Sequence, residues 1–215
     1  MEAFSDGVIA IIITIMVLEL RAPHETSLAG LRPLVPVFGS YVMSFIYIGI
    51  YWSNHHHLLH VTEHIDGRAL WANLHLLFWL SLVPFVTAWM GENHFSQWPV
   101  ALYGGILLLS AIAYTILVRV LLAAPGNELL ASALGSDFKG KISMVIYAVA
   151  IALTFVRPWL AFACYIFVAM MWLIPDRRIE RRISYYTKGT KNTEGMFSLL
   201  CSCAFLWLKL LPGRY

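Results

Sequence analysis

Long windows without a charged side chain recur along this chain of 215 residues. The clearest two run from residue 33 to 54 and from residue 95 to 118. Each is longer than the roughly 20 residues that a helix needs to cross the hydrocarbon core of a bilayer. The chain is 60% apolar and 13% charged, whereas soluble domains are about 45–50% apolar and about 25% charged. These windows predict an integral membrane protein with no room for a separate soluble catalytic domain.

The spacing of the windows predicts six transmembrane helices in one all-α integral membrane domain that covers residues 1–175. Pro84 is expected to kink the third helix, because a proline removes one backbone hydrogen bond. Arg157-Pro158 divides the last apolar stretch into two helices that form a hairpin. The six helices are expected at about residues 4–21, 34–57, 69–90, 99–122, 142–156 and 158–175.

Residues 176–215 are predicted to form a basic tail, which holds more than half of the Lys and Arg residues. A basic tail favours the cytoplasmic side, and six helices then put both termini there. Its expected partner is anionic membrane lipid, and a short apolar segment from Met196 to Leu211 fits an interfacial position. Basic and aromatic residues do not interleave as they do on nucleic-acid-binding surfaces, so no nucleic-acid partner is expected.

The first helix carries two acids, Asp6 and Glu19, which bracket a run with no other ionisable group. Their separation of 13 steps corresponds to roughly 20 Å of helix, which is short of the roughly 30 Å bilayer core. Acids in this position usually face the inside of a bundle or a water-filled path. The run therefore suits an inner helix, either a pore constriction or a packed core. Ser5 and Asp6 are also favoured residues at a helix start.

A run of five histidines within ten positions suggests a second kind of site. His56, His60 and His64 would share one face of a helix, a spacing that suits metal ligands. A histidine-ligated haem or metal membrane oxidoreductase is therefore an alternative function. His75 and His94 are isolated, however, and such sites draw ligands from several helices. No metal and no cofactor are therefore expected. An ion-coupled transporter that uses the two acids of the first helix is another alternative.

Three motifs, in order along the chain, resemble those of a known family. Phe4-Ser5-Asp6 resembles the Phe-Ser-Asp signature of the transmembrane protein 175 family of potassium channels, in its prokaryotic branch. The resemblance continues at Tyr51-Trp52-Ser53-Asn54-His55-His56 and at Leu70-Trp71-Ala72-Asn73-Leu74. It covers residues 1 to about 90. The family carries an arginine four residues before the Phe, a position that would precede Met1 here.

The resemblance implies a six-helix subunit that forms a homotetramer in the bacterial plasma membrane. The first helix of each subunit would line a central pore that is permeable to K⁺, and the chain would not be an enzyme. Bulky apolar rings would form a hydrophobic gate in place of a carbonyl filter. Aligned on the signature, the constriction falls on Ile11, Ile15 and Leu18, with Thr14 as the pore-lining polar residue and Glu19 at the pore mouth. At about 100° per residue the first four share one face, although the helix is apolar on every side.

The resemblance also implies a polar network that holds the first helix against its neighbours. The signature serine and aspartate would bond to groups on the second and third helices. By position these groups are His55 and Asn73, with Trp52 packed nearby.

Overall fold

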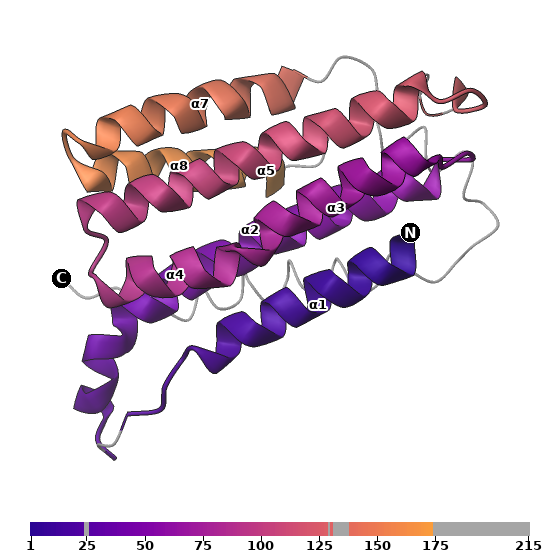
Figure 1. Ribbon diagram of the computed structural model, residues 1–215. Coiled ribbons are helices and arrows are strands. Elements are labelled where there is room, and N and C mark those ends of the chain that lie inside the picture. Colours follow the sequence, from indigo (N-terminus) through magenta and orange to yellow (C-terminus); the bar gives the residue numbers. More distant parts are fainter. Residues whose placement is uncertain (24–25, 129, 131–137, 174–215) are drawn as a thin grey trace. The chain divides into compact units, whose positions relative to one another are not determined.

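The computed structural model describes residues 1–23, 26–128, 130 and 138–173, and it is helical with no strand in these ranges. The predicted all-α class is therefore confirmed (Figure 1). The predicted basic tail lies outside the described residues. The α-helices are α1 (Glu2–Leu18), α2 (Val35–His60), α3 (Gly67–Ser81), α4 (Val83–Glu92), α5 (Gln97–Ala123), α7 (Phe138–Thr154) and α8 (Pro158–Leu173), and a short 3-10 helix, η1 (Leu28–Leu34), precedes α2.

Helices α3 and α4 follow each other along one stretch of 26 residues, Gly67–Glu92. With that pair counted once, the α-helices of the described residues number six, as predicted. The Gly67–Glu92 stretch is interrupted at Leu82, two residues before Pro84, as expected for a helix broken by proline. Among the described residues, three stretches are long and apolar enough to cross a membrane, namely Leu28–His60, Gly67–Glu92 and Gln97–Ala123, and α8 is a shorter apolar helix.

The first helix is shorter than predicted, because it ends at Leu18 and not near residue 21. Glu19 is the C-cap, and the backbone N–H of Leu20 donates to the carbonyl of Val17 in a tightened last turn. Pro23 disfavours helical backbone in the residue before it. Glu19 therefore lies just beyond the helix.

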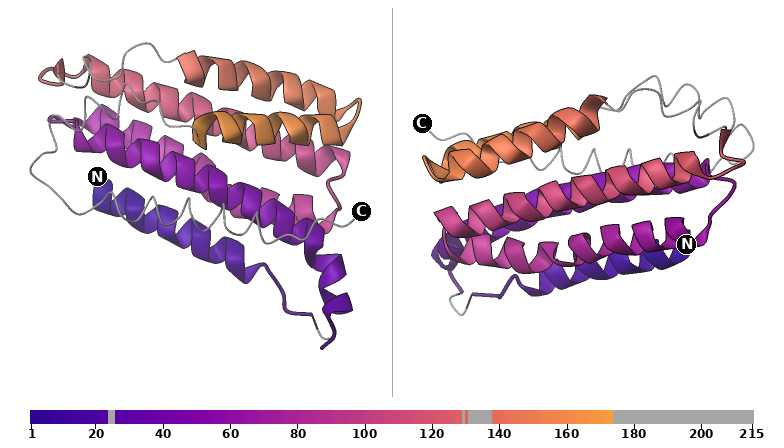
Figure 2. Two further views of the ribbon diagram at one scale, coloured as in Figure 1. Left: turned by 180° about the vertical axis from the view of Figure 1, so that it is seen from behind. Right: turned by 45° about the horizontal axis from the view of Figure 1, so that its top comes forward.

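The helices are arranged so that α1 lies at one edge and the α7–α8 hairpin at the other (Figures 1 and 2). Helix α1 packs against α2, α3 and α4, whereas α5 contacts α3, α4, α7 and α8. The corner between α7 and α8 contains Pro158 at the first position of α8, where its missing N–H would have no helical partner anyway. Within the described part of the chain, one face of α1 is thus left without a neighbouring helix.

Buried tyrosines link the central helices. The Tyr47 hydroxyl on α2 donates to the carbonyl of Tyr165 on α8 at 2.7 Å, and the Tyr165 hydroxyl donates to the carbonyl of Val100 on α5 at 3.2 Å. Gly104 makes room for this ring, because a Cβ at that position would overlap the Tyr165 hydroxyl. The next residue, Gly105, has open space where its Cβ would lie.

The buried side-chain amide of Asn127 fixes the loop between the end of α2 and the start of α3. The Asn127 side chain accepts from the N–H groups of Glu63 and His64 and donates to the carbonyls of His64 and Leu121. Asp66 then caps α3 by accepting from the N–H of Ala69 at 2.8 Å. These contacts position the residues from which the functional site is built.

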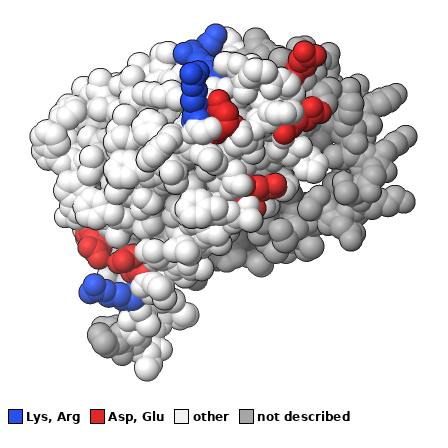
Figure 3. Space-filling model, turned by 45° about the vertical axis from the view of Figure 1, so that its right-hand side comes forward, with Lys and Arg blue, Asp and Glu red and all other residues white. Residues whose placement is uncertain are grey.

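Charged side chains on the surface gather in separate groups. In the view of Figure 3 acidic and basic side chains occur together in two areas, one in the upper part and one at the lower left, with uncharged surface between them. An uncharged band between polar ends is the arrangement expected of helices that cross a bilayer.

Candidate functional site

Helix α1 has one face buried in the subunit and one face exposed. Its buried residues are Ser5, Ile9, Ile12 and Met16, which recur at the three- and four-residue spacing of one helical face. The exposed apolar side chains include Ile11 (58% exposed), Ile15 (42%) and Leu18 (77%). Phe4, Gly7 and Thr14 are exposed as well. The predicted constriction residues therefore lie together on a face that no other helix among the described residues covers.

Thr14 adds a polar atom to this exposed face, one turn from Ile11. Its hydroxyl donates to the carbonyl of Ile11 at 2.8 Å, the usual back-bond of a threonine within a helix. The lone pairs of the hydroxyl oxygen remain directed away from that bond. Glu19 is also exposed, directly after the last helical residue.

The buried face of α1 is held by a chain of hydrogen bonds. The Asn73 side chain on α3 donates from Nδ2 to the Ser5 hydroxyl at 2.9 Å, and its Oδ1 lies 2.7 Å from Nε2 of His55 on α2. Ser5 in turn donates to the carbonyl of Met1 at 3.2 Å. Because the amide oxygen can only accept, the proton of a neutral His55 ring lies on Nε2. The structure thus brings three predicted residues from three helices into one buried network.

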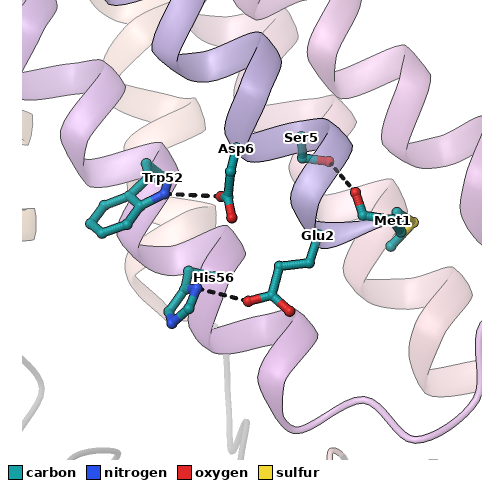
Figure 4. A network of polar contacts seen from close by, with 6 residues as sticks. All are labelled: Met1, Glu2, Ser5, Asp6, Trp52 and His56. Carbon is teal, nitrogen blue, oxygen red and sulfur yellow. Dashed lines mark hydrogen bonds and ion pairs between the residues drawn. The ribbon is translucent and has the colours of Figure 1, made fainter. Parts of the chain in front are cut away.

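A second set of contacts lies beside the first (Figure 4). The indole N–H of Trp52 donates to Oδ1 of Asp6 at 3.0 Å, so Trp52 bonds the signature aspartate directly and does not merely pack nearby. Nδ1 of His56 lies 2.9 Å from a carboxylate oxygen of Glu2. The sequence did not predict the pairing of Glu2 with His56, since it suggested His56 only as a metal ligand together with His60 and His64. The signal available was their spacing of one turn from Asp6 and Trp52.

The histidine run does not form the helical face on which the oxidoreductase alternative depended. Helix α2 ends at His60, so His64 lies in the following loop, where its ring approaches Gly126. The rings of His56 and His60 stack with their centroids 6.1 Å apart. His75 accepts a hydrogen bond from the indole N–H of Trp79 at 2.9 Å. His56 and His60 therefore share a helical face, as predicted, but His64 does not, because the helix stops at His60.

The sequence of this chain is similar to known bacterial proteins over most of its length. It is 55% identical over 184 residues to a potassium channel of Chryseobacterium sp.. The aligned residues make up 85% of this chain and 96% of that protein. The profile described as endosomal/lysosomal potassium channel TMEM175 matches residues 1–84. The chain belongs to the TMEM175 family of potassium channels. The resemblance seen in its motifs is thereby confirmed, and the oxidoreductase alternative is excluded, because these relatives are channels and not enzymes.

Two further comparisons, one of structure and one of sequence, support the relationship to TMEM175 channels. The fold matches the crystal structure of a potassium-selective TMEM175 homologue from Chamaesiphon minutus with a TM-score of 0.70 and 29% identity, over 80% of this chain and 94% of that one. A potassium channel from the same organism is 32% identical over 175 residues, which cover 74% of this chain and 85% of that protein. The chain is accordingly a membrane protein with the fold of TMEM175 channels.

Proposed function

We propose that four copies of this chain assemble around their α1 helices and conduct K⁺ passively through the pore between them. The observation that carries the proposal is the uncovered apolar face of α1, with Ile11, Ile15 and Leu18 exposed at successive turns of the helix. A helix exposed to lipid along its whole length would not have an acid at each end of a run of roughly 20 Å. The potassium channels to which the chain is similar support the choice of ion.

The constriction is formed by three apolar rings, one from each of the exposed residues Ile11, Ile15 and Leu18. Such rings gate by excluding water from the pore. An ion passes only if it gives up part of its hydration shell, and K⁺ does so more readily than Na⁺. Thr14 supplies hydroxyl oxygens between these rings, and Glu19 attracts cations at the pore mouth. The permeant ion is the only ligand that this mechanism requires.

The polar contacts of Ser5 and Asp6 act as an anchor for α1 and not as a site for the permeant ion. Ser5 is fully buried against Asn73, and Asp6 is directed at Trp52 on α2, away from the exposed face. This placement argues against the coupled-transporter alternative, in which Asp6 would bind the transported ion. Phe4, the first signature residue, is exposed beside the same end of the constriction face.

We also infer that both termini lie in the cytoplasm of a bacterium, with the domain in its plasma membrane and membrane lipid around the tetramer. Trp172 near the end of α8 donates to Ser143 near the start of α7, and Figure 1 shows α7 and α1 both beginning on the right-hand side of the bundle. The basic residues at this end are Arg68, Arg119, Lys139 and Lys141, against Arg21, Arg32 and Arg157 at the other. The difference is a single residue, so the inferred orientation rests on the basic tail of residues 176–215.

The decisive experiment measures K⁺ and Na⁺ flux into liposomes that contain the purified chain, with Ile11→Asn as the variant. Wild-type protein should pass K⁺ faster than Na⁺ under equal gradients, and Ile11→Asn should pass the two ions at more similar rates because a polar ring no longer excludes water. Ile166→Asn is the matched control, since Ile166 is 43% exposed on α8, away from the constriction face. The control should keep the wild-type ratio.

Two results would contradict the proposal. One is an absence of ion flux from wild-type liposomes whose protein runs as an intact oligomer. The other is a change in the K⁺ to Na⁺ ratio that is equal in Ile11→Asn and Ile166→Asn, since it would mean that α1 has no special position.

A further inference from the structure

Two carboxylates and one imidazole converge at the start of α1. Glu2 and Asp6 lie one turn apart on α1, and His56 reaches them from α2 (Figure 4). One ligand atom from each of the three side chains lies within 4.8 Å of the other two. We propose that these residues form a binding site for a divalent transition-metal ion of the Zn²⁺ type.

The distances are close to those of a metal site. Zn²⁺ bonds to nitrogen and oxygen at about 2.0–2.1 Å, so tetrahedral ligands lie roughly 3.4 Å apart. The Glu2 carboxylate and His56 Nδ1 are already 2.9 Å apart, and ligand atoms at the outer separation of 4.8 Å would need to approach by about 1.4 Å. Three protein ligands leave the fourth position to water.

The surroundings hold the ligands in place. Trp52 donates to Oδ1 of Asp6 and leaves its other oxygen for the ion. The His56 ring is stacked between Trp52, at a centroid distance of 5.7 Å, and His60, at 6.1 Å. Its Nδ1 atom is buried and faces Glu2. Partners that orient ligands in this manner are typical of metal sites.

Charge favours a cation at this position. Two carboxylates this close repel each other, and one imidazole contributes at most a single positive charge. A divalent ion between them would remove the repulsion. The nitrogen ligand selects a transition metal, because Mg²⁺ and Ca²⁺ take oxygen ligands. No metal was expected from the sequence, because no histidines from other helices joined the run. In this site the additional ligands are carboxylates from a different helix.

The site would link α1 to α2 beside the network of Ser5 and Asn73. Binding would therefore restrain the first turn of α1 and stabilise the folded protein. The binding claim does not depend on the proposed pore, because it concerns contacts within one subunit.

Isothermal titration with ZnCl₂ tests the site on tag-free protein in detergent. Wild-type protein should bind one Zn²⁺ per subunit at this site, and Zn²⁺ should raise its Tm, whereas MgCl₂ should do neither. Glu2→Gln and His56→Gln should each weaken this binding at least about tenfold, the lower range for disturbed metal sites. His94→Asn is the control, since His94 is exposed in the turn after α4 and asparagine tolerates its positive φ of 50°.

The two ligand variants should elute and melt as wild-type protein does without metal, which separates loss of a ligand from loss of fold. An absence of Zn²⁺ binding by the wild-type protein would overturn the proposal. Binding that survives in both Glu2→Gln and His56→Gln would also overturn it, because the ion would then bind elsewhere. Neither result depends on ion flux.

Discussion

Asn73 is the residue whose loss should most damage the anchor of α1. It is 2% exposed and joins Ser5 on α1 to His55 on α2 through one amide. In Asn73→Ala the His55 ring loses its partner at Nε2, and its Nδ1 already has none among the described residues. A buried polar group left without a partner costs about 1–3 kcal/mol. Ser5 keeps its bond to Met1, so we expect a loss in unfolding free energy of about 3 kcal/mol or less.

The loss can be measured by unfolding in mixed micelles with increasing denaturing detergent, followed by tryptophan fluorescence. Asn93→Ala is the matched control, since Asn93 is exposed and its side chain donates to the carbonyl of Trp89 one turn earlier. It should change the unfolding free energy by no more than about 0.5 kcal/mol. A double-mutant cycle with Ser5→Ala should give a coupling of about 0.6–1.7 kcal/mol, the range for hydrogen bonds between membrane helices. Equal losses in Asn73→Ala and Asn93→Ala, or a coupling of zero, would refute the reasoning.

Three further substitutions can be measured in the same unfolding assay. Gly104→Ala should destabilise the protein by about 1–3 kcal/mol because the new methyl group meets Tyr165, whereas Gly105→Ala, which has open space, should be neutral or stabilise by up to about 1 kcal/mol. Asn127→Ala should cost about 1–3 kcal/mol, since it leaves loop N–H and carbonyl groups without their partner. Asp66→Ala should cost about 1 kcal/mol through loss of the cap of α3.

Each of these expectations has a result that would contradict it. Equal effects of Gly104→Ala and Gly105→Ala would mean that the contact with α8 is looser than the structure places it. A neutral Asn127→Ala would mean that water replaces the buried amide. Asp66→Asn is expected to keep the unfolding free energy close to that of the wild-type protein, because asparagine can also cap a helix. A loss as large as that of Asp66→Ala would argue against a capping role.

The number and order of the membrane spans could be predicted because hydropathy is a property of single residues that adds along a window. The break before Pro84 was predictable for a similarly local reason, since the proline ring removes one bond of its own helix. Helix ends were less predictable. Helix α1 stops at Leu18 and α2 stops at His60, where caps and turns compete with continued helix by small free energies.

The glycine pair on α5 shows which part of helix packing a local sequence pattern can predict. Gly104-Gly105 indicates close helix packing, yet only Gly104 lies under a neighbouring side chain. The two residues differ by about 100° around α5, and the position of α8 decides which of them is needed.

For α1 the sequence by itself determined that a short apolar helix between two acids cannot face lipid along its whole length. It did not determine which face is exposed, because the helix is apolar on every side. Tertiary packing decided this by burying Ser5, Ile9, Ile12 and Met16 and leaving Ile11, Ile15 and Leu18 uncovered. Packing likewise brought Glu2 and Asp6 to His56. The physical reason is that burial in the membrane depends on composition, whereas hydrogen bonds and ligand sets depend on distances between residues far apart in the chain.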